Sequence, residues 1–251
     1  MYSYLYDEFL EDKRYEREVG VIETRLTDLG IMGKVTRLAL FRDPVAVVKN
    51  EIADGARTVV AVGDDGTLRR VLEAVLPNCR QSGESQVVVG FIPVVKGGVL
   101  GPLLGIDAGS SACDTLSARL VQEIDLGEVN GRPYLHAAAG TFHSPKLSLQ
   151  QSEMIWSGWA DFQIINLALS VGKFEIDPTD GALDFFASQL KRRWFRKEEY
   201  LTHLRAGSFL LTSDKKMTVI LDSEESLTAD QLIFQVLPGR LRLVTGKDRR
   251  F

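Results

Sequence analysis

The residues Gly63-Asp64-Asp65-Gly66-Thr67 combine glycines with carboxylates directly after an apolar run. Glycine lets the backbone come close to a bound group, and the first N–H groups of a helix attract an anion. A carboxylate at the same place can hold Mg²⁺ directly or through water. This combination is typical of a phosphate site. The same spacing also occurs in ordinary α/β turns, where the glycines only relieve backbone strain.

Two elements must position this segment. Residues 59–62 are apolar and β-branched, which predicts a strand buried on both faces of a parallel sheet. After the glycines, apolar side chains recur at helical spacing on one face, at Leu68, Val71, Leu72, Val75 and Leu76. The sequence therefore predicts a strand, a loop over residues 63–67 and a helix that packs back on the sheet.

The loop with its following leucine, residues 63–68, resembles the G-G-D-G-T-L loop of the diacylglycerol kinase catalytic-domain family. This family includes bacterial lipid kinases and sphingosine kinases and is related in fold to NAD kinases. The resemblance implies that the nucleotide phosphates are bound by Gly63, Asp64, Asp65, Gly66 and Thr67. It also implies that Asp65 is a catalytic group and a metal ligand. Asp64 replaces the second glycine of the family, which puts a negative side chain close to those phosphates.

A second glycine-rich segment follows the next predicted strand. Residues 93–106 align without gaps with the family motif P-L-G-T-G-N-D-F-A-R-x-L-G-I and keep Pro93, Gly97, Leu104, Gly105 and Ile106. The resemblance adds Lys96 and Gly97 to the nucleotide-binding candidates. Lys96 replaces a threonine, Gly98 an asparagine and Val99 an aspartate, so most polar members of the motif are absent. Lys96 either compensates for the extra carboxylate near the phosphates or is solvated.

Strands and helices alternate over the first part of the chain. The predicted strands are residues 2–6, 34–41, 59–62 and 86–92. Helices are predicted over residues 15–29, from Pro44 to near Gly55, and after the glycine loop. This alternation predicts a Rossmann-like α/β domain with a parallel sheet.

The pattern changes from about residue 110 onward. A predicted helix over residues 111–120 precedes two strand-like runs joined by Asn130-Gly131, a strong hairpin signal. The first run contains Ile124-Asp-Leu-Gly127, which resembles a family strand. Further strand candidates are residues 162–170, 183–187, 208–211, 217–221, 231–236 and 241–244. The candidates before residue 240 predict a C-terminal antiparallel β-sandwich. The expected domains are nucleotide-binding over 1–107 and substrate-binding over 108–240, with a closing strand in 241–251 that returns toward the first domain.

Two later segments also resemble family motifs and carry carboxylates. Residues 178–184 match P-x-D-D-G-x-L-D, which implies Asp180 as a Mg²⁺ ligand, whereas an Asp-Gly turn before a strand gives the same sequence. Residues 221–224 lie where the family has D-G-E, with Ser223 in place of the glycine. The resemblance implies that Asp222 is the catalytic base for the attacking hydroxyl and that Glu224 supports it.

Composition limits the classes of function. The chain has 251 residues, of which 45% are hydrophobic and 25% charged, and its net charge is -4. These values favour a globular protein of one large or two small domains and do not favour a nucleic-acid partner. The two cysteines, Cys79 and Cys113, and the three histidines lack metal-ligand spacing. The chain has no signal-peptide pattern and no run of about 18 apolar residues, so we expect a cytoplasmic protein.

The segment Leu190-Lys-Arg-Arg-Trp-Phe-Arg-Lys197 is basic and aromatic. Such a segment suits peripheral contact with an anionic membrane, and a solvated helix face followed by Glu198 and Glu199 is the alternative. The sequence leaves homodimer formation open.

Taken in order along the chain, the matches imply a lipid kinase that uses ATP and Mg²⁺ and transfers the γ-phosphate to a lipid hydroxyl. The alternative is a catalytically degenerate family member that binds a nucleotide, a lipid or a protein without turnover. The replacements at Asp64, Gly98 and Val99 motivate this alternative.

Overall fold

The computed structural model describes residues 1–38, 43–78, 87–149, 152–168, 170–193, 196–223 and 225–251. The chain folds into two compact units: unit 1 comprises Met1–Ile124 and Arg240–Arg250, and unit 2 comprises Asp125–Gly239. Residues 108–124, which the sequence analysis assigns to the second domain, group with unit 1 instead. The reason is that helix α5 (Ser111–Ala118) buries one face against strand β4 (Val88–Pro93) of this unit.

A parallel sheet forms the centre of unit 1. Its strand order is β2 (Gly33–Leu38), β1 (Tyr2–Asp7), β3 (Thr58–Gly63), β4 (Val88–Pro93) and the end of β16 (Glu225–Val244). Arg242 and Leu243 of β16 pair in parallel with Val88 and Val89. Strands β3 and β4 are buried at every position, as expected for central strands covered on both faces.

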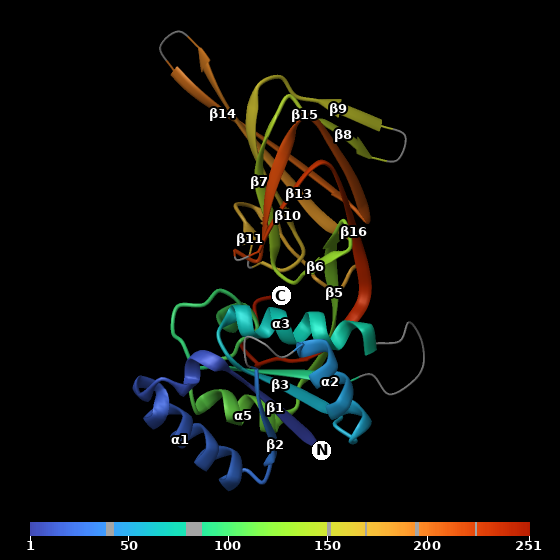
Figure 1. Ribbon diagram of the computed structural model, residues 1–251. Coiled ribbons are helices and arrows are strands. Elements are labelled where there is room, and N and C mark those ends of the chain that lie inside the picture. The colour runs from blue at the N-terminus through green and yellow to red at the C-terminus, as the bar shows by residue number, and fades with distance from the viewer. Residues whose placement is uncertain (39–42, 79–86, 150–151, 169, 194–195, 224) are drawn as a thin grey trace. The chain divides into compact units, whose positions relative to one another are not determined.

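Helices cover both faces of this sheet (Figure 1). Helices α2 (Pro44–Ala53) and α3 (Asp65–Val75) lie on one face, and α1 (Lys13–Asp28) and α5 lie on the other. Short helices connect the larger elements: η1 (Glu8–Glu11), η2 (Leu76–Asn78) and α4 (Leu100–Leu103). The predicted apolar face of α3 is buried, so the predicted Rossmann-like α/β domain is confirmed.

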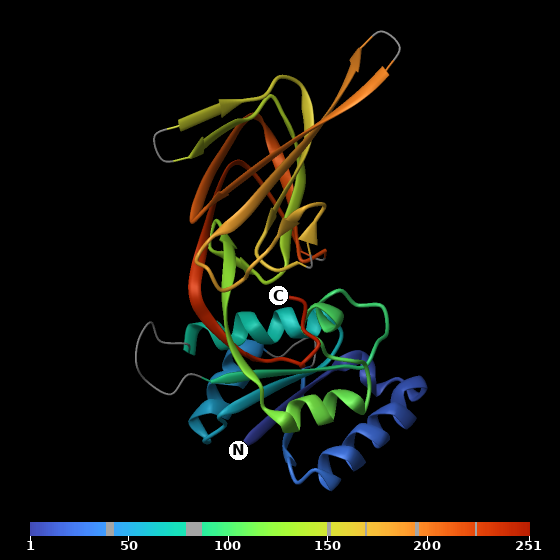
Figure 2. The same cartoon turned by 180° about the vertical axis from the view of Figure 1, so that it is seen from behind.

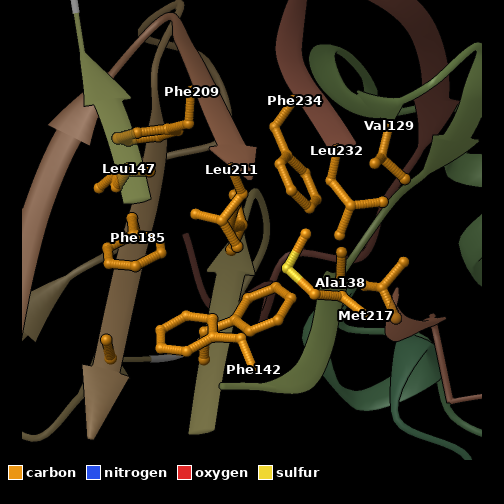
Figure 3. Packing of buried hydrophobic residues seen from close by; sticks show 14 of the residues in the cluster. Val129, Ala138, Phe142, Leu147, Phe185, Phe209, Leu211, Met217, Leu232 and Phe234 are labelled. Carbon is orange, nitrogen blue, oxygen red and sulfur yellow. The ribbon is translucent and has the colours of Figure 1, made fainter. Parts of the chain in front are cut away.

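Unit 2 consists of antiparallel strands. The order is β14 (Arg196–Ala206), β13 (Leu183–Arg193), β10 (Trp159–Ile165), β7 (Ala137–His143), β15 (Ser208–Leu221) and β16. Shorter strands add to it: β5 (Val121–Val129), β6 (Arg132–Tyr134), β8 (Lys146–Leu149), β9 (Ser152–Ile155), and the pair β11 (Ser170–Val171) and β12 (Phe174–Glu175). Their inner faces enclose a core in which Phe142, Phe185, Phe209 and Phe234 are buried (Figure 3). The predicted β-sandwich is confirmed.

The predicted hairpin at Asn130-Gly131 forms between β5 and β6. Asn130 has a φ of 47° and Gly131 a φ of 81°. A two-residue type I′ turn requires this left-handed backbone at both central residues, and Asn-Gly adopts it at low cost. No helix in the part of the chain that the structure describes is long and apolar enough to cross a membrane.

Several element bounds differ from the sequence predictions. The candidates 208–211 and 217–221 form one strand, β15, with a register shift between Thr212 and Met217. The candidates 231–236 and 241–244 likewise form one strand, β16. The helical alternative for the basic segment is wrong, because its described residues belong to β13 and β14.

Cys113 is fully buried in unit 1, and its Sγ lies 3.9 Å from the carbonyl oxygen of Ile22. Burial raises the pKa of the Cys113 thiol to about 11. Because the thiolate is the reactive form, we expect Cys113 in the folded protein to resist Ellman's reagent at mildly alkaline pH and to react fully after unfolding. The measurement uses a Cys79→Ser background, since Cys79 lies outside the described residues. Rapid labelling of the folded variant would contradict this burial.

Candidate functional site

The predicted glycine loop is mostly the start of helix α3. Asp64 is the N-cap residue, and Asp65 begins the helix, so only Gly63 and Asp64 of the expected loop precede it. The Asp64 carboxylate accepts a hydrogen bond from Thr67 N at 2.9 Å, and Asp64 N donates to Thr67 Oγ1 at 3.1 Å. This reciprocal pair is a capping box. Asp64 therefore stabilises the helix start.

The Thr67 side chain is buried and connects this cap to the end of β1. Its hydroxyl donates to the Asp7 carboxylate, which also pairs with Arg70. A Cβ at Gly63 would lie 2.2 Å from Thr67 Oγ1, so glycine at this position makes room for the contact. The sequence analysis misses Asp7 and Arg70, because no local pattern signals contacts between residues so far apart in the chain.

Asp65 points toward the second glycine-rich segment. Its Oδ2 accepts hydrogen bonds from Val99 N at 2.6 Å and Leu100 N at 3.2 Å, at the start of α4. A Cβ at Gly98 would lie 2.6 Å from Asp65 Oδ1. The absence of a side chain at residue 98 therefore lets the Asp65 carboxylate reach this turn and connect the two glycine-rich segments.

A cavity of about 430 Å³ opens beside Asp65, a volume in the range of small-molecule sites. Its lining residues are Asp65, Pro93, Val95, Lys96, Gly97, Gly98, Gly101, Pro102, Ile106, Asp107, Ala108 and Ser111. The structure thus brings Asp65, Lys96 and Gly97 to one cavity. The other predicted phosphate-binding residues, Gly63, Asp64, Gly66 and Thr67, do not line it. Their nucleotide role stays a prediction.

The donor set of this cavity suits a Mg²⁺ ion that arrives with a phosphorylated ligand. Mg²⁺ usually keeps several waters and binds through one or two carboxylates together with substrate phosphates. Asp65 and Asp107 supply carboxylates here. Among the described residues, no group of three or more His, Cys, Asp or Glu side chains is placed to hold a metal ion. The residues therefore fit Mg²⁺ bound with a nucleotide better than a metal site made by the protein alone.

Asp180, the other predicted metal ligand, has protein partners on both carboxylate oxygens. Its Oδ1 accepts a hydrogen bond from Ala182 N at 2.9 Å, and its Oδ2 forms an ion pair with Arg205. Asp180 thus closes a turn before β13, which is the alternative that its sequence left open. This geometry does not favour the predicted Mg²⁺ role.

Asp222 lies in the turn between β15 and β16 of unit 2. Its carboxylate is nearly buried and accepts hydrogen bonds from the backbone N–H groups of Leu135 at 2.8 Å, His136 at 2.8 Å and Ala137 at 3.1 Å. Burial raises the pKa of the Asp222 carboxyl, and the three N–H groups offset part of this rise. A carboxylate with a raised pKa is a stronger base. Glu224, its predicted support, lies outside the described residues.

Unit 2 holds a second buried carboxylate, for which the sequence analysis gives no role. Asp125 is 2% exposed and accepts hydrogen bonds from Gly181 N and Gly239 N, both at 2.7 Å. The side-chain amide of Asn166 donates to the Asp125 carbonyl oxygen at 2.8 Å. Asp125 therefore fixes three segments that are distant in the sequence. The resemblance at residues 124–127 marks this strand but not the role of its aspartate.

The first half of the chain also matches a known family. Residues 11–129 match the model described as the diacylglycerol kinase catalytic domain. The matched residues, a little under half of the chain, are thus similar to the diacylglycerol kinase catalytic-domain family. Both glycine-rich segments and all residues that line the cavity beside Asp65 lie within residues 11–129. The match to this family thus includes the residues that form the candidate site in unit 1.

Curated relatives from two organisms align with part of the kinase-family segment. The chain is 36% identical over 111 residues to the Pseudomonas aeruginosa protein named "Probable lipid kinase YegS-like". It is 31% identical over 102 residues to the Pseudomonas fluorescens protein of the same name. These matches cover 44% and 41% of this chain, and 35% and 32% of the two relatives. The chain therefore matches about a third of the length of these relatives.

Solved structures of proteins from Bacillus anthracis str. Sterne share the fold over nearly the whole length of this chain. A diacylglycerol kinase aligns with a TM-score of 0.75 and 16% identity, over 98% of this chain and 97% of that chain. A second structure from the same organism aligns with a TM-score of 0.76 and 14% identity, with the same coverage. At these identities the likeness shows the fold alone. The shared fold includes unit 2 as well as unit 1.

Proposed function

We propose that the chain is a lipid kinase that transfers the γ-phosphate of ATP to a lipid hydroxyl in the presence of Mg²⁺. One observation carries the proposal: Asp65, Lys96 and Gly97 line a single cavity at the start of α3, inside the kinase-family segment. The lipid kinase relatives support the reaction class. The identity of the lipid is left to experiment.

In unit 1, Asp65 would hold Mg²⁺ and Lys96 would contact phosphate oxygens. Lysine is a flexible point cation, and Lys96 is exposed at the cavity, so its ammonium group can follow a bound phosphate. Gly97 has a φ of 96° and no atom within 4 Å of an added Cβ, which leaves its backbone open to a ligand. Bound Mg²⁺ neutralises the charge that develops on the transferred phosphate.

In unit 2, Asp222 would accept the proton of the lipid hydroxyl. The backbone N–H groups of Leu135, His136 and Ala137 hold its carboxylate in one orientation. Among the described residues, Oδ2 accepts only the Leu135 N–H, which leaves it able to accept one more hydrogen bond. A positioned base with a raised pKa assists transfer, although most of the catalysis comes from alignment and charge stabilisation.

The proposal is tested with purified protein, labelled ATP and a panel of diacylglycerol and sphingoid lipids in mixed micelles. We expect transfer of the label to at least one lipid, and loss of transfer when Mg²⁺ is chelated. A protein that binds ATP but labels no lipid of the panel at any Mg²⁺ concentration would contradict the kinase proposal.

A binding protein without turnover is the second candidate, and the Asp64 cap favours it. An anion at the N-terminus of α3 would compete with Asp64 for the Thr67 N–H. It would also meet the negative charge of Asp64 itself, since like charges in one site repel. The family glycine at this position brings neither effect.

The variant Asp64→Asn tests whether the charge of Asp64 opposes ATP binding. Asparagine caps a helix as well as aspartate, so the stability of α3 should be unchanged. Loss of the charge should raise ATP affinity by about fivefold, because two unit charges roughly 4 Å apart in water repel by about 1 kcal/mol. Calorimetric titration with ATP measures the affinity, and thermal unfolding measures the stability.

Asp43→Asn is the matched control, because Asp43 is the N-cap residue of α2 and accepts a hydrogen bond from Val45 N. We expect it to leave ATP affinity unchanged. Equal affinities for the wild type and both variants would show that residue 64 does not face the nucleotide.

A further inference from the structure

Helix α4 forms part of the wall of the cavity beside Asp65, through Gly101 and Pro102. It is a single turn of four residues, and a helix of this length does not form without contacts from outside. Its first end is held by the Asp65 carboxylate, which accepts hydrogen bonds from Val99 N and Leu100 N. The position of this cavity wall therefore depends on what holds the other end of α4.

The 246–250 segment, which follows β16 in unit 1, holds the other end of α4. Gly246 N donates to the Leu104 carbonyl oxygen at 2.8 Å, and Arg250 N donates to the Leu103 carbonyl oxygen at 3.0 Å. The last carbonyl groups of a helix have no partner within the helix, so these two bonds satisfy acceptors that α4 leaves open. Figure 2 shows the red segment beside the short green helix α4, and Figure 1 shows the same arrangement from the opposite side.

Two glycines let the 246–250 segment lie directly on the turn after α4. A Cβ at Gly246 would lie 1.8 Å from the Gly105 carbonyl oxygen, and a Cβ at Gly105 would lie 2.5 Å from Arg249 N. Both clashes are with backbone atoms, so no side-chain rotation could relieve them. Gly105 also has a φ of 68°, a conformation that favours glycine. The turn packed in this way leads into the cavity residues Ile106 and Asp107.

We propose that the 246–250 segment is a positioning element of the nucleotide site. It fixes α4, and α4 fixes the Asp65 carboxylate and the cavity wall in the arrangement that binds Mg²⁺ and ATP. This inference rests on the proposed function, because it concerns the same cavity. The segment does not line the cavity, so it acts through α4. Because a site binds its ligand more weakly when its competent arrangement is less populated, loss of the segment's contacts should weaken ATP binding.

A matched pair of variants at Arg250 tests the proposal. Arg250→Pro and Arg250→Ala both remove an exposed side chain, but only proline also removes the N–H group that donates to Leu103. We expect Arg250→Pro to weaken the binding of ATP with Mg²⁺ by about tenfold, the change in apparent Kd if α4 is in its competent position about a tenth of the time. Arg250→Ala should bind ATP like the wild type. Calorimetric titration measures both affinities.

Gly246→Ala is a second test, because its methyl group would push the segment away from Gly105. Gly20→Ala on α1 is its control, since a Cβ there meets nothing within 4 Å. Hydrogen exchange followed by mass spectrometry reports on α4 directly. The amides of residues 97–106 should exchange faster in Arg250→Pro and Gly246→Ala than in the wild type and both controls. Thermal unfolding checks that every variant is folded.

The outcomes separate this proposal from the kinase proposal. If the wild type binds ATP and Arg250→Pro binds it equally tightly, the 246–250 segment does not position the site, and the proposed function is unaffected. Faster exchange in residues 97–106 with unchanged ATP affinity would also overturn the proposal, since the segment would then have a structural role only. A wild type that binds no ATP would refute the nucleotide site itself and this inference with it.

Discussion

Asp222→Asn is expected to lower kcat for phosphoryl transfer by roughly 10²–10⁴-fold, the usual contribution of a positioned general base. Asparagine cannot accept the hydroxyl proton. ATP affinity should be unchanged, because the cavity lined by Asp65 and Lys96 belongs to unit 1. Steady-state kinetics and a calorimetric ATP titration on the same preparation separate the two effects.

The pH dependence of the kinase activity is a second test of the role of Asp222. The base must be ionised, so activity should fall as the pH drops through the pKa of Asp222, which burial raises above that of an ordinary aspartate. Asp161→Asn, which changes an exposed aspartate of β10, should leave both kcat and the pH profile unchanged. A folded Asp222→Asn variant with the wild-type kcat would show that Asp222 is not the base.

Asp125→Ala should destabilise the protein by about 3 kcal/mol, since a buried N–H group without a partner costs about 1–3 kcal/mol and this change leaves two of them. Both oxygens of the Asp125 carboxylate have a donor, Gly181 N and Gly239 N, and Asp125 is 2% exposed. Water has little access to replace the lost acceptors. Urea unfolding followed by fluorescence measures the loss.

The Asp161→Ala variant is the control for this loss, because it removes an exposed carboxylate from the same unit and should change stability by less than about 0.5 kcal/mol. Asp125→Asn should fall between the two, since its amide oxygen can accept one of the two hydrogen bonds. If Asp125→Ala and the wild type unfold at the same midpoint concentration of urea, the Asp125 carboxylate does not hold these segments together.

The sequence predicts the architecture well where the patterns are local. The β-branched run before Gly63 and the helical spacing after Thr67 both report which faces are buried, and β3 and α3 follow them. The Asn-Gly pair specifies its turn through backbone conformation alone. Local periodicity and turn chemistry thus suffice for these elements.

Strand continuity is predicted poorly, because polar or turn-forming residues need not end a strand. Residues 213–216 are polar, yet β15 continues through them with a register shift. The pair Pro238-Gly239 predicts the end of a strand, yet β16 continues through it. The carboxylate of Asp125 accepts a hydrogen bond from Gly239 N at this point of the strand. These outcomes depend on partners that are distant in the chain.

The site is predicted in part. The resemblance supplies Asp65, Lys96 and Gly97, which the structure places at one cavity. It says nothing of the contact between Asp7 and Thr67, because these residues are 60 positions apart in the chain. The resemblance also does not reveal that Asp64 caps α3. The aspartate that replaces the family glycine therefore stabilises the helix start, although its negative charge would repel a bound phosphate.

The nucleotide site in unit 1 is tested most directly by calorimetric titration of wild type and Asp65→Asn with ATP, each with Mg²⁺ and with a chelator. Asparagine can still accept the N–H groups of Val99 and Leu100, so the fold of this turn should survive the change. We predict that Mg²⁺ strengthens ATP binding to the wild type and has little effect on Asp65→Asn. A wild type that binds no ATP with Mg²⁺, or an Asp65→Asn variant with the full Mg²⁺ effect, would contradict the assignment.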